Sequence, residues 1–343
     1  MLYSVRIFLV KIYFSNYNLY NRYDLSDARL YFQNKFMSLT MESSLLHNSL
    51  KFIDQAIIKA IAYSDIFDYP LTTAEIHRYL EKPASLEWVT SRLQNGPITA
   101  LKISQVGPYY SLSGRENLVS KRLERAKRAE QLWPHAIRYA KWIYYLPFVR
   151  MVAVTGALSV DNADYHTDID YFIVTEPGRL WLCRASIILL VHLASRQGVR
   201  LCPNYLISDQ ALQITEHNLY TAHELTQMVP LYGMNIYNKL REVNSWVTGI
   251  LPNASGPPRN FNIYHSSNKI NKIQRLSESI LLTPPGDFIE RWEMKRKIKK
   301  LSPTGSENGE VAFSKDYCKG HFGGYAQQTL RNYRERLDLL TMS

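Results

Sequence analysis

The chain has 343 residues, of which 46% are hydrophobic, and a formal net charge of +11 at pH 7. This length predicts two or three domains of roughly 100–200 residues each, and the hydrophobic content is ordinary for a core-forming protein, which argues against a disordered chain. The basic charge favours polyanionic partners, nucleic acid or nucleotides, without choosing between them. The three cysteines form no C-x-x-C pair, so we expect no disulfide framework or zinc site and a cytoplasmic location.

The first forty residues are crowded with Tyr, Asn and Phe and differ in composition from the rest. Arg6 and Lys11 interrupt the opening apolar run, which makes it a poor membrane span, and it lacks a small-residue cleavage site. We therefore interpret residues 1–45 as an atypical leader and expect no membrane partner. One hypothesis places the natural start at Met37 or Met41, which a mass measurement of the native N-terminus would test.

Residues 48–114 predict a small helical domain that ends in a hairpin. Apolar residues at helical spacing open the region, Thr72 or Thr73 is suited to cap a second helix, and Ser85 is suited to cap a third. Two short strands are expected around Gly107-Pro108. Three helices and a hairpin in this order resemble a winged helix-turn-helix module.

The third helix of that module would carry any base-reading side chains, yet Arg92 is its one cation. The alternatives are protein contacts or the positioning of a substrate. Residues 115–150 then predict a basic helical connector, rich in Lys and Arg between residues 121 and 128. Its basic face is either a solvated helix surface or a contact for nucleic-acid phosphates.

The most informative stretch follows this connector. MVAVT, starting at Met151, is a short apolar strand, Gly156-Ala157 opens a polar loop, and DIDYFIV is a second strand that begins with Asp168 and Asp170. Side chains alternate along a strand, so these two carboxylates point to one face roughly 6.5–7 Å apart. Two such carboxylates repel each other unless a proton or a cation compensates them.

The chemistry of this stretch suits a metal-bound triphosphate. Mg²⁺ prefers one or two carboxylates completed by phosphate oxygens and water. A glycine at the end of the preceding strand lets a phosphate approach the backbone N–H groups. The stretch therefore predicts a glycine turn for a triphosphate, followed by a carboxylate pair for its metal.

Gly156-Ala157, a ten-residue loop and Asp168-Ile169-Asp170 together resemble the signature of the DNA polymerase β-type nucleotidyltransferase superfamily. The wider layout, with SDIFDYPLT upstream, is similar to stand-alone prokaryotic nucleotidyltransferase-domain proteins of undefined substrate. The resemblance implies an α+β fold with a mixed-sheet nucleotidyltransferase core over residues 151–220. It also implies Mg²⁺ ions held by the two aspartates, triphosphate bound at Gly156 and Ala157, and attack of an unknown hydroxyl acceptor on the α-phosphate of an NTP.

Two positions depart from the family's pattern. Ala157 stands where the family usually has Ser or Gly, and the third carboxylate of a later strand has no clear counterpart. The matching strand, residues 201–207, offers Cys202 or Asn204, and Glu224 is an acid whose position the spacing does not fix. The alternative function is therefore a catalytically degenerate nucleotide-sensing module, whose winged-helix domain binds nucleic acid or a protein.

Residues 221–343 predict a helical region, with a Pro/Gly/Asn-rich linker near residues 251–260. The run RWEMKRKIKKLS, from Arg291 to Ser302, has a dense basic face. In multi-domain members of the family a helical part often binds the acceptor. This run is accordingly either an acceptor surface that admits nucleic acid or an ordinary solvated helix.

Overall fold

The computed structural model describes residues 52–96, 101–261, 272–301, 311–320 and 324–342. Contacts divide the chain into two compact units, Met1–Phe52 and Ile53–Ser343. The predicted leader and both candidate start sites lie outside the described residues. All elements below belong to the second unit.

The N-terminal part of this unit contains the expected helices and hairpin. A helix over residues 52–65 precedes β1 (Leu71–Thr72), α3 (Thr73–Arg78), α4 (Leu86–Asn95), β2 (Ile103–Val106) and β3 (Tyr109–Leu112). The strands form an antiparallel sheet in the order β1-β3-β2. Both predicted caps are confirmed, since Thr72 forms a capping box with Glu75 and Ser85 accepts a hydrogen bond from the backbone N–H of Trp88.

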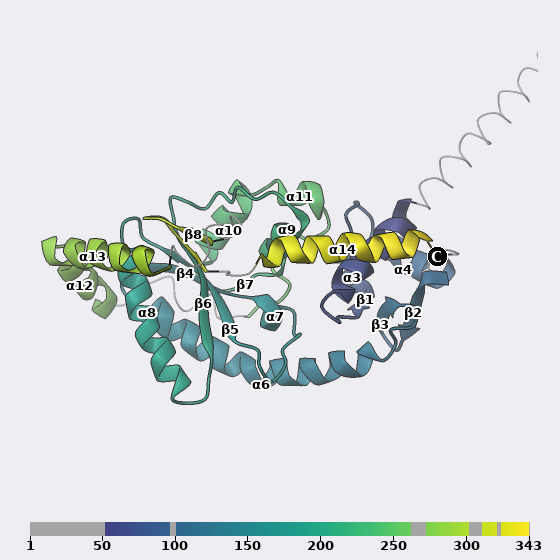
Figure 1. The fold of residues 1–343 in the computed structure, drawn as a ribbon, viewed down its shortest axis with the longest axis horizontal. Helices are drawn as coiled ribbons and strands as arrows, with labels where there is room; N and C mark the ends of the chain where they lie inside the picture. Colours follow the sequence, from purple (N-terminus) through teal and green to yellow (C-terminus); the bar gives the residue numbers. More distant parts are fainter. Residues whose placement is uncertain (1–51, 97–100, 262–271, 302–310, 321–323, 343) are drawn as a thin grey trace, which may run out of the picture. The chain divides into compact units, whose positions relative to one another are not determined.

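A six-stranded mixed sheet in the order β7-β4-β5-β6-β9-β8 forms the centre of the fold (Figure 1). β5 runs parallel to β6, and the other neighbouring pairs are antiparallel. The α+β class is thus confirmed. The strands are β4 (Val149–Thr155), β5 (Ile169–Thr175), β6 (Leu201–Ser208), β7 (Val229–Tyr232), β8 (Val311–Phe313) and β9 (Tyr317–Gly320).

The neighbouring strands β4 and β5 contribute side chains to two separate cores, because successive side chains of a strand point to opposite faces of the sheet. Val152 and Tyr171 pack with the long helix α6 (Leu118–Tyr144) and with α8 (Leu180–Ser195). Ala153 and Phe172 pack on the other face, with α9 (Leu219–Gln227), α10 (Met234–Val243) and α11 (Val247–Ile250). Figure 1 shows α6 and α10 on opposite sides of the sheet. Residues buried on both faces explain the nearly continuous apolar runs of β4 and β5.

The region predicted as helical, residues 221–343, also gives the sheet three of its strands. β7 lies beside β4, and β9 and β8 extend the sheet beyond β6. β7 is only four residues long, and Pro230 within it cannot continue the helix expected there. The remaining helices in this region are α12 (Lys272–Leu281), α13 (Pro284–Leu301) and α14 (Tyr325–Met342).

Polar contacts attach the N-terminal helices to the rest of the unit. Arg78 on α3 donates hydrogen bonds to the carbonyl oxygens of Thr226, Ser255 and Gly256, at 2.6–3.0 Å. Asn253 bonds to the backbone of the loop before α4, through Ala84 N–H and the Lys82 carbonyl. The segment predicted as a linker therefore forms part of this contact.

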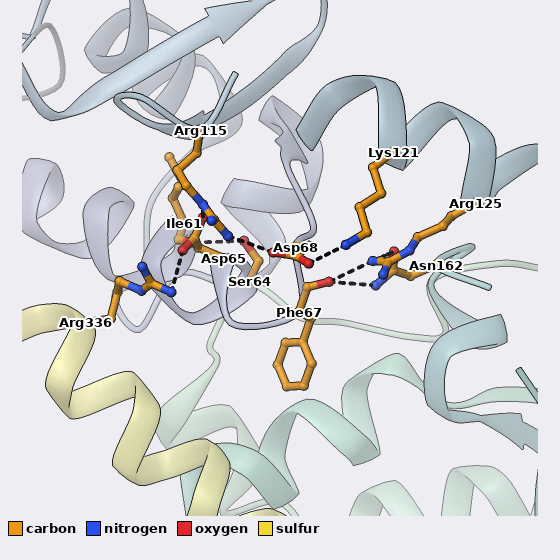
Figure 2. A network of polar contacts seen from close by, with 10 residues as sticks. All are labelled: Ile61, Ser64, Asp65, Phe67, Asp68, Arg115, Lys121, Arg125, Asn162 and Arg336. Carbon is orange, nitrogen blue, oxygen red and sulfur yellow. Dashed lines mark hydrogen bonds and ion pairs between the residues drawn. The ribbon is translucent and has the colours of Figure 1, made fainter. Parts of the chain in front are cut away.

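A second set of contacts surrounds the loop that follows the helix over residues 52–65 (Figure 2). Asp65, the last residue of that helix, and Asp68 in the loop pair with cations from three other parts of the chain, namely Arg115, Lys121 on α6 and Arg336 on α14. Arg125 on α6 donates to the Phe67 carbonyl and to Asn162 Oδ1, both at 3.0 Å. The Phe67 carbonyl also accepts from Asn162, so this loop is connected to the one between Gly156 and Asp168.

Among the described residues, no helix combines the length and the apolar character needed to cross a membrane.

Candidate functional site

The two aspartates lie where β5 begins, between β4 and β6. Ile169 is buried in the core, as its alternation with the aspartates predicts. Asp170 is the register partner of Thr155, the last residue of β4, and of Cys202 on β6. Asp170 therefore lies between the ends of two neighbouring strands, which accounts for its partial burial.

Gly156 lies directly against Asp170. Its backbone has φ of +65°, and a Cβ atom at this position would lie 2.5 Å from Asp170 Oδ2. Both conditions require glycine, because other residues rarely adopt this φ and their Cβ would displace the carboxylate. Ala157 follows in α7 (Gly156–Ser159), and its carbonyl oxygen accepts from Asn162 N–H at 2.8 Å. The glycine turn and the carboxylate thus share one small volume.

Asp170 has an unusual affinity for a proton. Burial raises the pKa of Asp170 to about 7, a hydrogen bond with Cys202 acts to lower it, and the charge of Asp168 raises it. The same surroundings raise the pKa of the Cys202 thiol to about 12, through burial and the charge of Asp170. A carboxylate held this way is stabilised by a proton or by a bound cation.

Glu224 on α9 is a third carboxylate near this position. Burial raises the pKa of Glu224 to about 7, with a further contribution from the charge of Asp170, whereas Lys319 acts to lower it. The spacing of residues in the sequence did not predict that Glu224 lies near Asp170. Glu224 comes close because α9 packs on the sheet in the core that contains Ala153 and Phe172. The helical spacing of apolar residues around Glu224 predicts a helix that packs on the sheet, and this is the signal that would have suggested Glu224 as a neighbour of the site.

A pocket opens beside Glu224, and neither Asp168 nor Asp170 lines it. It has a volume of about 50 Å³, which is room for a few water molecules. Its lining is partly apolar and partly polar, with Lys319 from β9 as its cation. The residues that line it are Thr155, Phe172, Asn204, Tyr205, Ile214, Tyr220, Thr221, Glu224, Leu225, Met228 and Lys319. Asn204, one of the two residues considered for the third-carboxylate position, faces this pocket.

Asp168 lies in a different environment from Asp170. Its side chain is 46% exposed, and Arg200 Nε lies 2.9 Å from Asp168 Oδ1. The Arg200 carbonyl oxygen accepts from Ile169 N–H at 2.8 Å, which fixes its backbone beside β5. Asp168 therefore pairs with a cation, Arg200. Asp170 instead interacts with the Cys202 thiol and with a second acid, Glu224.

The donor set fits Mg²⁺ that arrives with a phosphate better than a metal held by protein alone. Within the described ranges, no group of three or more His, Cys, Asp or Glu side chains is arranged to hold a metal ion. Asp168 and Asp170 offer two hard oxygen donors, and Mg²⁺ commonly takes one or two carboxylates and completes its shell with phosphate oxygens and water. The strand position opposite Asp170 holds Cys202, so β6 supplies no third carboxylate there.

Two of the three basic surfaces considered for nucleic acid, the third helix of the N-terminal region and the start of α6, have cations that are engaged within the protein. Arg92, on the helix that would read bases, pairs with buried Asp54 at 2.6 Å. On α6, Lys121 pairs with Asp68, Arg122 pairs with Glu75, and Arg125 bonds to Phe67 and Asn162. These cations stabilise the docking of the N-terminal helices onto α6, which reduces the positive surface left for phosphates.

Comparison of the chain with protein-family models, with curated proteins and with solved structures finds no match in any of the three. The functional argument therefore depends on the geometry of the site.

Proposed function

We propose that the protein is a Mg²⁺-dependent nucleotidyltransferase of the DNA polymerase β type, which moves a nucleoside monophosphate from an NTP to an unknown hydroxyl acceptor in the cytoplasm. The observation that carries the proposal is the position of Gly156, whose absent Cβ would lie 2.5 Å from Asp170 Oδ2, so that a glycine turn stands directly beside a carboxylate of raised pKa. In this reading the fold is a nucleotidyltransferase core with a docked winged-helix-like module.

The residues have distinct roles in this proposal. Asp168 and Asp170 hold the metal, and the turn at Gly156 and Ala157 receives the triphosphate. When bound, Mg²⁺ neutralises the phosphates and orients the in-line displacement. Glu224 accepts the proton of the attacking hydroxyl, since a base with a pKa of about 7 is matched to neutral pH. Arg200, which pairs with Asp168, would be available to a phosphate oxygen if a metal ion took its place on that carboxylate.

Calorimetric titration of an NTP panel, with and without Mg²⁺, tests the proposal. Wild type is expected to bind a nucleotide only with the metal, and the double variant Asp168→Ala/Asp170→Ala is expected to lose that binding. Asp209→Asn is the matched control, because it removes one negative charge just beyond the opposite end of β6. Equal binding by wild type and the double variant would refute the assignment of the site.

A second candidate is a nucleotide sensor without catalysis, favoured by Cys202 at the strand position opposite Asp170. The two candidates differ in the part that Glu224 plays. If Glu224 is the base of an enzyme, Glu224→Gln lowers the release of pyrophosphate from the NTP and leaves Mg²⁺-dependent nucleotide binding near that of wild type. If the site is degenerate, wild type releases no pyrophosphate, Glu224→Gln changes nothing, and Cys202→Asp strengthens Mg²⁺-dependent binding.

A further inference from the structure

The helical hairpin formed by α12 and α13 has an unusual distribution of side chains. Six large apolar residues on it are 42–65% exposed, far more than an ordinary packed helix pair requires. We define them as the hairpin face, which comprises Leu276, Ile280, Leu282, Phe288, Ile289 and Trp292. Gly286 lies in the first turn of α13 against the end of α12, where a Cβ would clash with the Leu281 carbonyl oxygen.

The inner side of the hairpin is, by contrast, partly acidic. Buried Glu278 accepts a hydrogen bond from Phe148 N–H and pairs with Arg150, at 2.7 and 2.9 Å. Buried Glu290 accepts from the N–H groups of Trp181 and Leu182 at the start of α8, at 3.0 and 2.7 Å. The hairpin thus packs two acids together with Leu281, Met294 and Ile298 against the core, and it still leaves six large hydrophobic side chains exposed, which indicates that the exposed face has a partner.

Among the described residues of the hairpin, the exposed charges that lie outside the ion pairs have one sign. Asp287 pairs with Arg179, and Glu293 pairs with Arg296, so each of the four acids of the hairpin is engaged within the protein. The remaining exposed charges on the two helices are positive. They are Lys272, Arg275, Arg291, Lys295 and Lys299. A partner of the hairpin face must therefore be apolar and anionic together.

The spacing places both kinds of side chain on one line. Phe288, Trp292, Lys295 and Lys299 recur at helical spacing along α13, and Leu276 and Ile280 do so along α12. Lysine side chains can extend past apolar neighbours and keep their charge in water. Trp and Phe beside Lys and Arg are the combination found on helices that lie in the interface of a membrane.

We propose that the hairpin face binds the surface of a bilayer that contains anionic lipids, with its apolar side chains in the interface and its cations on the headgroups. A helix can lie on a bilayer without crossing it, so the proposal needs no spanning helix. It departs from the sequence-based expectation of no membrane partner, which considered spanning segments. A nucleic acid would satisfy the cations and leave the six apolar side chains in water. The proposal is independent of nucleotidyl transfer.

Co-sedimentation of the full chain with lipid vesicles tests this. Vesicles of phosphatidylcholine with phosphatidylglycerol are expected to bind the protein, and vesicles of phosphatidylcholine alone are expected to bind it at least tenfold more weakly. Lys295→Gln/Lys299→Gln should reduce binding to the anionic vesicles about tenfold or more, because each basic residue near such a surface contributes about 1 kcal/mol. Phe288→Ala/Trp292→Ala should reduce it similarly through lost apolar insertion.

All four residues are exposed, so the variants are expected to fold, and their unfolding curves verify this. Leu339→Ala on α14 and Lys239→Gln on α10 are the matched controls, since both side chains are exposed and lie outside the hairpin. The proposal is overturned if wild type binds neither vesicle, or if the controls lose as much binding as the hairpin variants. Binding of wild type to an acidic amphipathic peptide or to a nucleic acid, without binding to vesicles, would overturn it equally.

Discussion

Two pairs of aspartates in this molecule differ in how far neighbouring cations compensate their charge. Asp65 and Asp68 are paired with Arg115, Lys121 and Arg336 (Figure 2). Burial acts to raise the pKa of Asp68. The hydrogen bond and charge of Lys121, together with the charge of Arg115, nevertheless lower this pKa below its ordinary value.

Asp168 and Asp170 have far less compensation. Arg200 is the ion-pair partner found for Asp168, and burial raises the pKa of Asp170 to about 7. Acids that stabilise a fold are paired, because an uncompensated buried charge is costly. An acid pair left without enough cations is therefore a candidate site for a ligand that brings positive charge. The four predictions below test this contrast.

The largest expected effect is at the paired site. Asp65→Asn leaves Arg336 without its ion-pair partner and Arg115 with Asp68 alone. Because Asp65 is buried while both arginines are about one-third exposed, we expect the free energy of unfolding in urea to fall by about 2–3 kcal/mol. Asp68→Asn is the control, because its side chain is 33% exposed and its loss should cost about 1 kcal/mol or less. Equal costs would show that burial does not separate the two residues.

Asp170→Asn is expected to stabilise the protein above pH 7 by on the order of 2 kcal/mol. The folded state keeps a proton on Asp170 that the unfolded chain releases between pH about 4 and about 7, so wild type loses stability as the pH rises through this window. The variant carries no such charge. Urea unfolding at pH 5 and pH 8 checks this. A gain of the same size at pH 5, where Asp170 is neutral in wild type, would contradict the electrostatic explanation.

Gly156→Ala should destabilise the fold by about 1–2 kcal/mol through its positive φ, and should reduce Mg²⁺-dependent nucleotide binding at least tenfold by displacing Asp170. Gly178→Ala is a close control. Gly178 has φ of +70° and nothing within 4 Å of its Cβ position, so it carries the backbone cost alone. Nucleotide binding that survives Gly156→Ala would argue against the proposed turn.

Arg200→Ala is expected to change stability by less than about 1 kcal/mol, because both members of the ion pair with Asp168 are about half exposed. It should raise the affinity for Mn²⁺ alone a few-fold by releasing Asp168 from its cation. Electron paramagnetic resonance of free Mn²⁺ measures this, with Arg200→Lys as the charge-preserving variant. A weaker affinity in Arg200→Ala would mean that Arg200 positions Asp168 for the metal.

Local sequence patterns predicted much of the fold. The caps at Thr72 and Ser85, the strands of MVAVT and DIDYFIV, and the burial of Ile169 follow from residue type and periodicity, and the structure confirms them. Strands β7, β8 and β9 could not be predicted in the same way. They have three or four residues each, too few for a period of two to be distinct, and they form because a sheet edge is available to them.

The residues of the candidate site likewise fall into those that a local motif predicts and those that only tertiary packing brings in. Gly156, Asp168 and Asp170 are close in sequence, so one motif contains them. Glu224 and Arg200 come from elements that the motif does not include, and their approach depends on how α9 and β6 pack. Their place in the site is a result of topology, which spacing along the chain does not encode.

The anchoring of residues 251–256 has a practical consequence for cutting the chain. Its Pro, Gly and Asn content is typical of a protease-sensitive hinge, yet Leu251 and Ala254 are buried, and Arg78 and Asn253 bind backbone across the contact. A protease needs an extended, accessible segment of several residues. We therefore expect native digestion to spare this segment.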